Sequence, residues 1–106
     1  MNLITVPISI ASAGDNTVIA AVATASYRIR RLFLTNTPAT VQAVTIKDGA
    51  SVSLTGAMQM QQIIGSQLNF GDNQDSPLFK TERGNAFIIN LLSATNVAGF
   101  VSYTVE

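Results

Sequence analysis

The sequence predicts an all-β fold: a single-domain antiparallel β-sandwich, jelly-roll-like, with about eight short strands in residues 1–106. Three observations predict this fold class. Apolar and polar residues alternate with a period of two along most of the chain, as they do in half-buried strands. Gly, Asn and Asp clusters separate these runs at regular intervals. The length of 106 residues is typical of one domain, and no stretch requires an α-helix.

Residues 3–10 predict the first strand. Four apolar side chains share one of its faces: Ile4, Val6, Ile8 and Ile10. Pro7 lies on the other face, and because proline has no N–H to donate, it favours an edge strand or an extended arm for residues 1–13. An arm would add to the sheet of a neighbouring molecule, whereas an edge strand would belong to the chain's own sandwich. A signal peptide is disfavoured, since no Lys or Arg precedes this run.

The next segments alternate turns and strands. Residues 14–16 (GDN) predict a turn, because Gly tolerates positive φ and Asp and Asn bond their own backbone. Residues 17–22 predict the second strand. Residues 41–47 and 51–54 flank Asp48-Gly49, which is the strongest short hairpin signal in the chain.

A longer third strand is predicted over residues 27–36, but its pattern changes phase. Apolar residues occupy odd positions up to Ile29 and even positions from Leu32 onward. Two explanations fit this pattern. Either a β-bulge near Arg30 and Arg31 resets the phase, or both faces of the strand are covered.

The C-terminal half contains shorter strands and one long closing strand. Residues 57–64 lie between two glycines and are expected to form an irregular strand or a loop. Short strands are expected at 68–70 and 78–81. Residues 86–92 are almost continuously apolar, which predicts a central strand buried on both faces. Residues 97–105 alternate again and predict the last strand.

Composition limits the possible functions. The chain has no His and no Cys, so it lacks the commonest general base and the commonest metal ligands. We therefore expect no enzyme activity, no cofactor and no small-molecule substrate. Six basic and six acidic residues make up only 11% of the chain, against about 25% in ordinary domains. A free monomer relies on surface charge for solubility, so a partner protein is expected to cover much of this surface.

The same composition argues against two classes of partner. The formal net charge is zero, whereas nucleic-acid binding requires a basic field. No apolar run approaches the roughly 20 residues of a membrane span. Neither a nucleic acid nor a membrane is an expected partner.

Few polar clusters suggest chemistry. Asp72 and Asp75 could form a carboxylate pair or a calcium site, but the EF-hand spacing and its final Glu are absent, which favours a solvated turn. Arg28, Arg30 and Arg31 form the one basic cluster. Without basic residues nearby in sequence, they favour a protein interface over an anion or nucleic-acid contact.

Two further groups leave alternatives open. Met58 and Met60, near Ile63 and Ile64, form either an adaptable contact surface or ordinary core. Tyr and Phe residues could stack on sugar rings if one sheet face exposes them. No catalytic, cofactor-binding or metal-binding residue is expected. The expected assembly interface consists of Ile4, Val6, Pro7, Ile8, Arg28, Arg30, Arg31, Met58, Met60, Ile63 and Ile64.

An ordered series of segments resembles a group of small structural proteins of tailed bacteriophages. The series runs from about residue 14 to the C-terminal end. It comprises residues 14–22 (GDNTVIAAV), 28–30 (RIR), 45–49 (TIKDG), 54–58 (LTGAM), 76–81 (SPLFKT), 84–90 (GNAFIIN) and 99–103 (GFVSY). Arg31 departs from the alternation, since an apolar residue would continue it.

The resemblance implies a non-enzymatic virion protein with a β-sandwich fold. Within such proteins, a capsid decoration or cement protein is the expected role. Such a protein would form a homotrimer, bind the outer face of the major capsid protein shell, and assemble in the host cytoplasm. A tail, baseplate or fibre component is the first alternative. A carbohydrate-binding β-sandwich module is the second.

Overall fold

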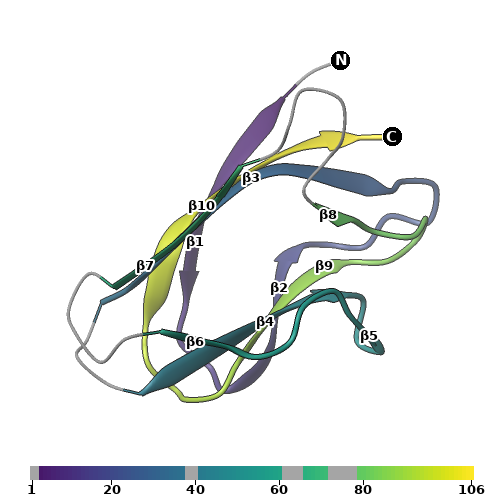
Figure 1. The fold of residues 1–106 in the computed structure, drawn as a ribbon. Helices are drawn as coiled ribbons and strands as arrows, with labels where there is room; N and C mark the ends of the chain where they lie inside the picture. Colours follow the sequence, from purple (N-terminus) through teal and green to yellow (C-terminus); the bar gives the residue numbers. More distant parts are fainter. Residues whose placement is uncertain (1–2, 38–40, 61–65, 72–78) are drawn as a thin grey trace.

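Ten β-strands form two antiparallel sheets in the part of the chain that the structure describes (Figure 1). The structure is a computed structural model, and it describes residues 3–37, 41–60, 66–71 and 79–106. The strands are β1 (Ile4–Ile10), β2 (Gly14–Ile19), β3 (Tyr27–Asn36), β4 (Gln42–Asp48), β5 (Val52–Ser53), β6 (Met58–Met60), β7 (Ser66–Gly71), β8 (Phe79–Lys80), β9 (Phe87–Leu91) and β10 (Val97–Val105).

The strand pairings nest inside one another. Sheet A has the order β1-β10-β3-β7, with β8 also paired to β3, and sheet B has the order β2-β9-β4-β5, with β6 also paired to β4. Thus β4 pairs with β5 and β6, β3 with β7 and β8, β2 with β9, and β1 with β10. Nested antiparallel pairs across two sheets are the topology of a jelly roll. The predicted all-β, jelly-roll-like sandwich is confirmed.

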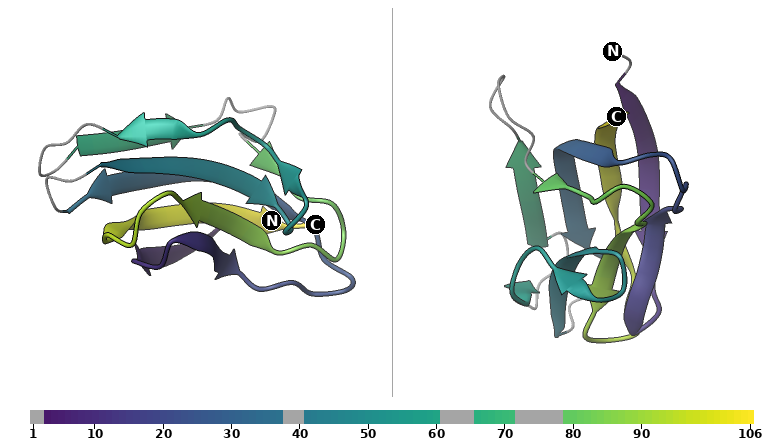
Figure 2. Two further views of the ribbon diagram at one scale, coloured as in Figure 1. Left: turned by 90° about the horizontal axis from the view of Figure 1, so that it is seen from below. Right: turned by 90° about the vertical axis from the view of Figure 1, so that its right-hand side faces the viewer.

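The structure has ten strands instead of the predicted eight or so, because two of the eight strand positions in the sheets each contain two short strands. β7 and β8 lie along the same side of β3 and pair with different parts of it. In the same way, β5 and β6 pair with opposite ends of β4. Each sheet therefore has four strand positions, and Figure 2 shows the two layers from two further directions.

A β-bulge in β3 explains the change of phase in its sequence. Ser102 of β10 pairs with Arg31, but the next residue, Tyr103, pairs with Ile29, so Arg30 is the extra residue. Ile29 and Leu32 are both completely buried, and Arg31 between them is exposed. Of the two explanations for this strand, the bulge near Arg30 and Arg31 is confirmed.

The core lies between the two sheets, and both contribute to it. β9 lies between β2 and β4 in sheet B. Phe87, Ile89 and Leu91 face the core, whereas Ile88 is on the opposite side of the strand and is still only 7% exposed. The prediction of a central strand buried on both faces is confirmed.

The structure corrects the predicted turn at residues 14–16. Gly14, with a φ of 92°, already begins β2, and Asp15 and Asn16 pair with β9. The chain reverses before Gly14 instead. The Asn16 side-chain amide donates hydrogen bonds to the Ser12 carbonyl at 2.8 Å and to the Gly14 carbonyl at 3.1 Å, so it stabilises the turn from within the strand.

Two expected elements have sharper bounds in the structure. The hairpin at Asp48-Gly49 is confirmed, since β4 and β5 pair on either side of it and Gly49 has a φ of 68°. Within the stretch 57–64, residues 58–60 form the short strand β6, and residues 61–64 lie outside the described part of the chain.

Candidate assembly surface

A pair of stacked aromatic rings lies on the outer face of sheet A. Phe33 of β3 pairs with Phe100 of β10, and their ring centroids are 5.8 Å apart with an interplanar angle of 24°. Both side chains are half-buried. The same row continues to Pro7 of β1 on one side and Asn69 of β7 on the other. Four strands thus carry this row across the sheet.

Strand alternation directs both rings outward. Val101 is completely buried, so Phe100 before it points to the opposite face of β10. Leu32 and Leu34 are completely buried as well, so Phe33 between them points outward. Because the bulge at Arg30 sets the phase of Leu32 and Leu34, it also determines that Phe33 lies on the surface.

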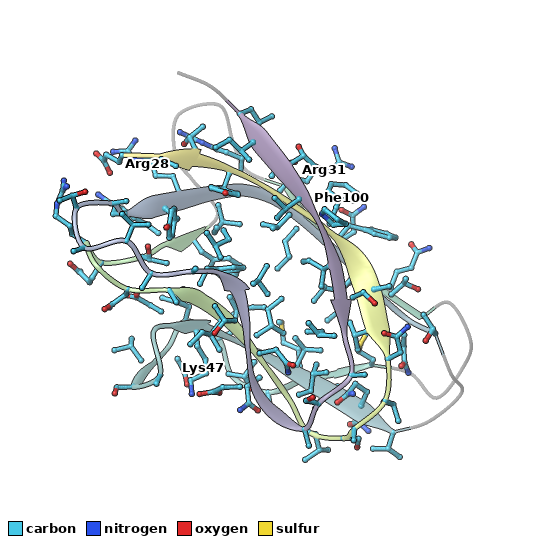
Figure 3. The ribbon with its side chains drawn as sticks, turned by 180° about the vertical axis from the view of Figure 1, so that it is seen from behind. Arg28, Arg31, Lys47 and Phe100 are labelled. Atoms are coloured by element: carbon cyan, nitrogen blue, oxygen red, sulfur yellow. The ribbon has the colours of Figure 1, made fainter. Side chains whose placement is uncertain are left out.

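Arg31 lies beside the aromatic pair, in the next row of side chains on the outer face of the sheet. That row runs from Thr5 through Ser102 to Arg31, and Thr5 and Ser102 share a side-chain hydrogen bond of 2.8 Å. Arg31 is exposed, and Figure 3 shows it on the same side of the molecule as Phe100. We call Pro7, Arg31, Phe33 and Phe100 the aromatic face. Its chemistry is an apolar centre with one cation.

Three other charged residues, Arg28, Lys80 and Glu106, gather farther along β3, at one end of the sandwich. The Glu106 carboxylate accepts hydrogen bonds from Arg28, at 2.9 Å from Nε and 2.5 Å from Nη2, and pairs with Lys80 Nζ at 3.1 Å. The hydrogen bond from Arg28, and then that from Lys80, lowers the pKa of Glu106 to about 2. Arg28 is therefore neutralised within the chain.

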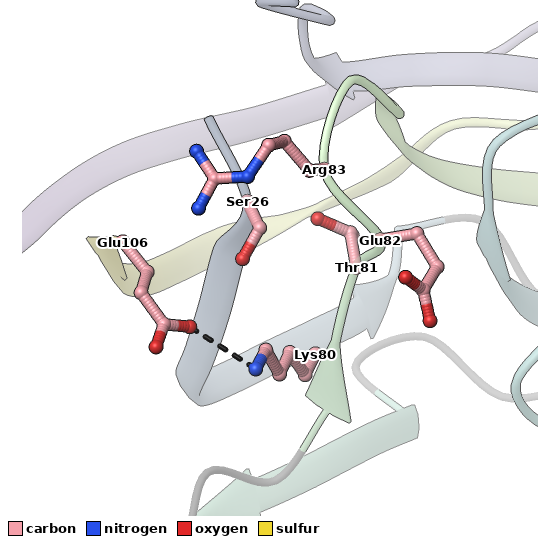
Figure 4. Close-up of a pocket in the computed structure, with 6 residues that line it drawn as sticks. All are labelled: Ser26, Lys80, Thr81, Glu82, Arg83 and Glu106. Atoms are coloured by element: carbon pink, nitrogen blue, oxygen red, sulfur yellow. Dashed lines mark ion pairs between the residues drawn. The ribbon is translucent and has the colours of Figure 1, made fainter. Parts of the chain in front are cut away.

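A depression of about 190 Å³ lies at this end (Figure 4). Its lining consists of Ser26, Lys80, Thr81, Glu82, Arg83 and Glu106. Thr81 is buried, and its Oγ1 accepts a hydrogen bond from the Tyr27 N–H at 2.9 Å. The lining thus contains two cations and two carboxylates, and Lys80 is already paired with Glu106. This composition does not favour binding of a free anion.

The outer face of sheet B has a different character. Lys47 Nζ pairs with Asp15 at 3.0 Å, and the Asn90 amide donates to the same carboxylate at 2.8 Å. The hydrogen bond from Asn90, followed by that from Lys47, lowers the pKa of Asp15. These three side chains connect three adjacent strands of the sheet, β2, β9 and β4, which indicates a structural role.

The residues of the expected interface divide between surface and core. Ile8 is 4% exposed and Met60 is 1% exposed, so both belong to the core. Val6 and Met58 are partly buried and pack against that core, whereas Ile4 is 38% exposed at the end of the edge strand. Placing Ile8 and Met60 on a contact surface was wrong, because their strand faces are turned towards the opposite sheet. For the methionines, the core interpretation is the one that the structure supports.

The remaining interface residues include two on the aromatic face. Pro7 and Arg31 lie there together, on β1 and β3. Arg30 is half-buried at the bulge, and Arg28 is paired with Glu106. Ile63 and Ile64 lie outside the described residues, as do Asp72 and Asp75.

Sequence reasoning missed Phe33 and Phe100 as surface residues. The signal for Phe100 was present, because residues 97–105 were expected to alternate, which places Phe100 on the face opposite Val101. Placing Phe33 on the surface required a choice between the two explanations for the pattern of β3, a bulge or a strand with both faces covered. That the rings touch depends on the register between β3 and β10, which the sequence does not determine.

The described residues contain no group of three or more His, Cys, Asp or Glu side chains placed to hold a metal ion. No helix in this part of the chain could cross a bilayer. Comparison with known proteins adds no assignment: no protein-family model matches the chain, and no curated protein matches it significantly.

Proposed function

We propose that this chain is a structural virion protein, specifically a capsid decoration protein. In this role it forms homotrimers and binds the outer face of a major capsid shell. The chain performs no catalysis, and its partners are copies of itself and the capsid protein. The resemblance of its segments to tailed-bacteriophage structural proteins supports this role, and the jelly-roll topology agrees with it, since viral capsid domains often use that fold.

The aromatic face is the observation that carries the proposal. Aromatic residues, Phe among them, and Arg are enriched at protein interfaces, where a few residues supply most of the binding energy. Phe33 and Phe100 present such a centre on a sheet face where Arg31 is the neighbouring cation. Burying this face desolvates few charges, so covering it with protein is favourable. A protein with this surface and only 11% charged residues is suited to permanent assembly.

Purified protein mixed with undecorated capsids tests the proposal. The expected result is additional density on the outer face of the shell by electron microscopy, at positions that follow the capsid symmetry. Absence of density on the shell would contradict the decoration role. Labelling the protein in intact particles distinguishes the alternative, because a tail, baseplate or fibre component would give signal on the tail.

The exposed aromatic pair also supports a second candidate, a carbohydrate-binding module. Sugar rings stack on aromatic side chains, and Gln67 and Asn69 on β7 supply hydrogen-bonding groups nearby. However, Phe33 and Phe100 stack on each other, so each ring covers part of the face that a sugar would need. A glycan array tests this candidate, and the absence of any bound glycan would eliminate it.

A further inference from the structure

Two charged side chains lack a partner within the described residues: Arg31 and Glu82. The other charged groups there are engaged by neighbours in the chain. Arg28 and Lys80 pair with Glu106, and Lys47 pairs with Asp15. Asp48 accepts hydrogen bonds from Asn85 and from the Glu82 N–H, Arg83 donates to the Thr24 carbonyl, and Arg30 is also engaged. Among the described residues, Arg31 and Glu82 thus remain as one unpaired cation and one unpaired anion.

Arg31 and Glu82 lie at different places on the molecule. Arg31 is in the middle of β3, on the aromatic face. Glu82 follows Thr81, which bonds to Tyr27 at the start of β3. Arg31 is four positions after Tyr27, which corresponds to about 13 Å of extended backbone. Arg31 and Glu82 do not pair within one copy of the chain, so each is available to pair with the other residue on a second copy.

The segment that carries Glu82 is held firmly in place. Its N–H donates to both oxygens of buried Asp48, at 3.2 and 3.1 Å, and its carbonyl accepts from the Asn85 N–H at 3.1 Å. The Gly84 N–H donates to the Ala25 carbonyl at 2.9 Å. Figure 4 shows the Glu82 side chain directed away from Glu106. Because this backbone is already fixed, binding costs the segment little backbone freedom, and the ordering cost is limited to the Glu82 side chain.

We propose that the aromatic face of one copy receives the Glu82 end of a second copy. The Glu82 carboxylate pairs with the Arg31 guanidinium, a geometry that permits two parallel hydrogen bonds. The inference rests on the self-association in the proposed function, but it does not depend on binding to a capsid shell.

Charge favours this head-to-tail contact over a symmetric one. If two aromatic faces met each other, both Arg31 side chains would be buried near the same centre. The rows that contain Phe33 and Arg31 provide no carboxylate in their described residues, so both cations would be desolvated without a counter-charge. A head-to-tail contact supplies one Glu82 for each Arg31. Contacts of this kind close into a ring when the rotation from copy to copy closes, which is the arrangement a trimer requires, and otherwise give open filaments.

Charge exchange tests the contact. Sedimentation velocity of the full chain over a range of concentrations should show an oligomer for the wild type. Arg31→Glu and Glu82→Arg should each weaken self-association by at least about tenfold, because each places like charges together. The double variant R31E/E82R restores opposite charges and should recover the oligomer. Thr17→Glu, on the exposed outer face of β2 in sheet B, changes charge elsewhere and should leave the oligomer intact.

Cross-linking provides a readout that does not depend on losing assembly. The chain contains no cysteine, so Arg31→Cys and Glu82→Cys can be made separately and mixed with a short bismaleimide. Linked dimers should form in the mixture and not with either variant alone. Dimers from R31C alone would indicate the symmetric contact and would overturn the proposal.

Two other outcomes would also overturn it. One is a wild type that sediments as a monomer at every concentration, and the other is single charge variants that assemble as the wild type does. A monomeric wild type would also contradict the homotrimer of the proposed function, whereas assembly of the single charge variants would contradict the contact between Arg31 and Glu82 alone. In both cases the capsid-mixing experiment reports independently on the decoration role. Failure of this inference is thereby distinguishable from failure of the proposed function.

Discussion

Gly99 is required by the close approach of β10 to β3. A Cβ built at Gly99 would lie 1.8 Å from the Phe33 carbonyl oxygen and 3.1 Å from the Leu34 Cα. Both are backbone atoms in a central strand, so they cannot move away as a flexible side chain would. The glycine lies directly before Phe100, so it also keeps the strands close beneath the aromatic pair.

We expect Gly99→Ala to lower the free energy of unfolding by about 2–4 kcal/mol, because overpacking against the backbone forces the two strands apart. Urea denaturation monitored by circular dichroism measures this change. Gly56→Ala is the matched control, since no atom lies within 4 Å of a Cβ at Gly56. It should change stability by less than about 0.5 kcal/mol. Equal effects of the two substitutions would contradict the steric explanation.

Asp48 is a buried carboxylate whose role lies outside its own hairpin. It is 4% exposed and accepts hydrogen bonds from the Glu82 N–H and from the Asn85 amide. The residue thus fastens the segment after β8 to the end of β4. Sequence reasoning placed Asp48 in a turn, and the turn chemistry was correct, but the contact with residues 82–85 is tertiary.

Asp48→Ala leaves two donors without their acceptor, and hydrogen bonds to charged groups contribute about 1.5–3 kcal/mol each. Both bonds are part-buried, so we expect a loss near the low end of their sum, about 3 kcal/mol in the free energy of unfolding. Asp15→Ala removes a carboxylate from the outer face of sheet B, where the side chain is 35% exposed, and should cost under about 1 kcal/mol. Chemical denaturation of the two variants side by side checks this order. A larger loss for Asp15→Ala than for Asp48→Ala would contradict the structural role given to Asp48.

At the scale of elements, the bulge in β3 organises sheet A. It turns Arg31 and Phe33 outward while Ile29 and Leu32 stay in the core. The bulge also lies between the two partners on this side of β3. β8 pairs with β3 at Arg28 and Ile29, and β7 pairs with β3 from Arg31 onward. One extra residue therefore determines both the composition of the aromatic face and the division of the neighbouring strand.

Glu106 connects the end of β10 to β3 and β8 through Arg28 and Lys80. Its pKa is lowered from 4.5 to about 2, so the folded state favours the charged carboxylate. The resulting stabilisation is fully present above pH 4.5 and is lost as the pH falls towards 2. Glu106→Gln should therefore reduce stability at neutral pH and have little effect near pH 2.

Thermal melts of wild type and E106Q between pH 2 and pH 7 measure this difference. Thr17→Ala is the control, because Thr17 is exposed and neither side chain ionises between pH 2 and pH 7, so its difference from the wild type should not change over this range. The Glu106 side chain is exposed, so we expect a small effect. A difference between wild type and E106Q that grows as the pH falls would contradict the assignment.

At the scale of the whole molecule, one core joins the two sheets. Tyr27 and Tyr103 are buried within it, with ring centroids 5.5 Å apart in an edge-to-face arrangement. The Tyr27 hydroxyl donates to the Ala20 carbonyl at 2.6 Å, which fixes the connection between the two sheets. Because residues from both sheets share this core, neither sheet should keep its structure when the other unfolds.

We therefore expect one cooperative unfolding transition. The chain has no Trp, so near-ultraviolet circular dichroism reports on Tyr27 and Tyr103, and the far-ultraviolet signal reports on the strands. Both signals should change at the same denaturant concentration. If copies associate, the midpoint should also rise with protein concentration. Two separate transitions would show that the sheets unfold independently.

The sequence by itself determined the fold class and most strand positions. Alternation in residues 27–36 and 97–105 matches β3 and β10 in their full length, and the apolar run at 86–92 contains the central strand β9. These patterns are local, because a strand with one buried face must alternate and a strand buried on both faces need not. The same physics restricted the phase change in β3 to two explanations.

Only the tertiary structure decided which side chains meet. Ile8 and Met60 lie in the core because the opposite sheet covers their strand faces, while Pro7 and Arg31 share a surface with Phe33 and Phe100 because four strands pair in one register. Register depends on contacts between residues that are far apart in the chain, and shifting it by one residue moves each side chain to the other face. The candidate surface is therefore a property of strand pairing that alternation along one strand does not contain.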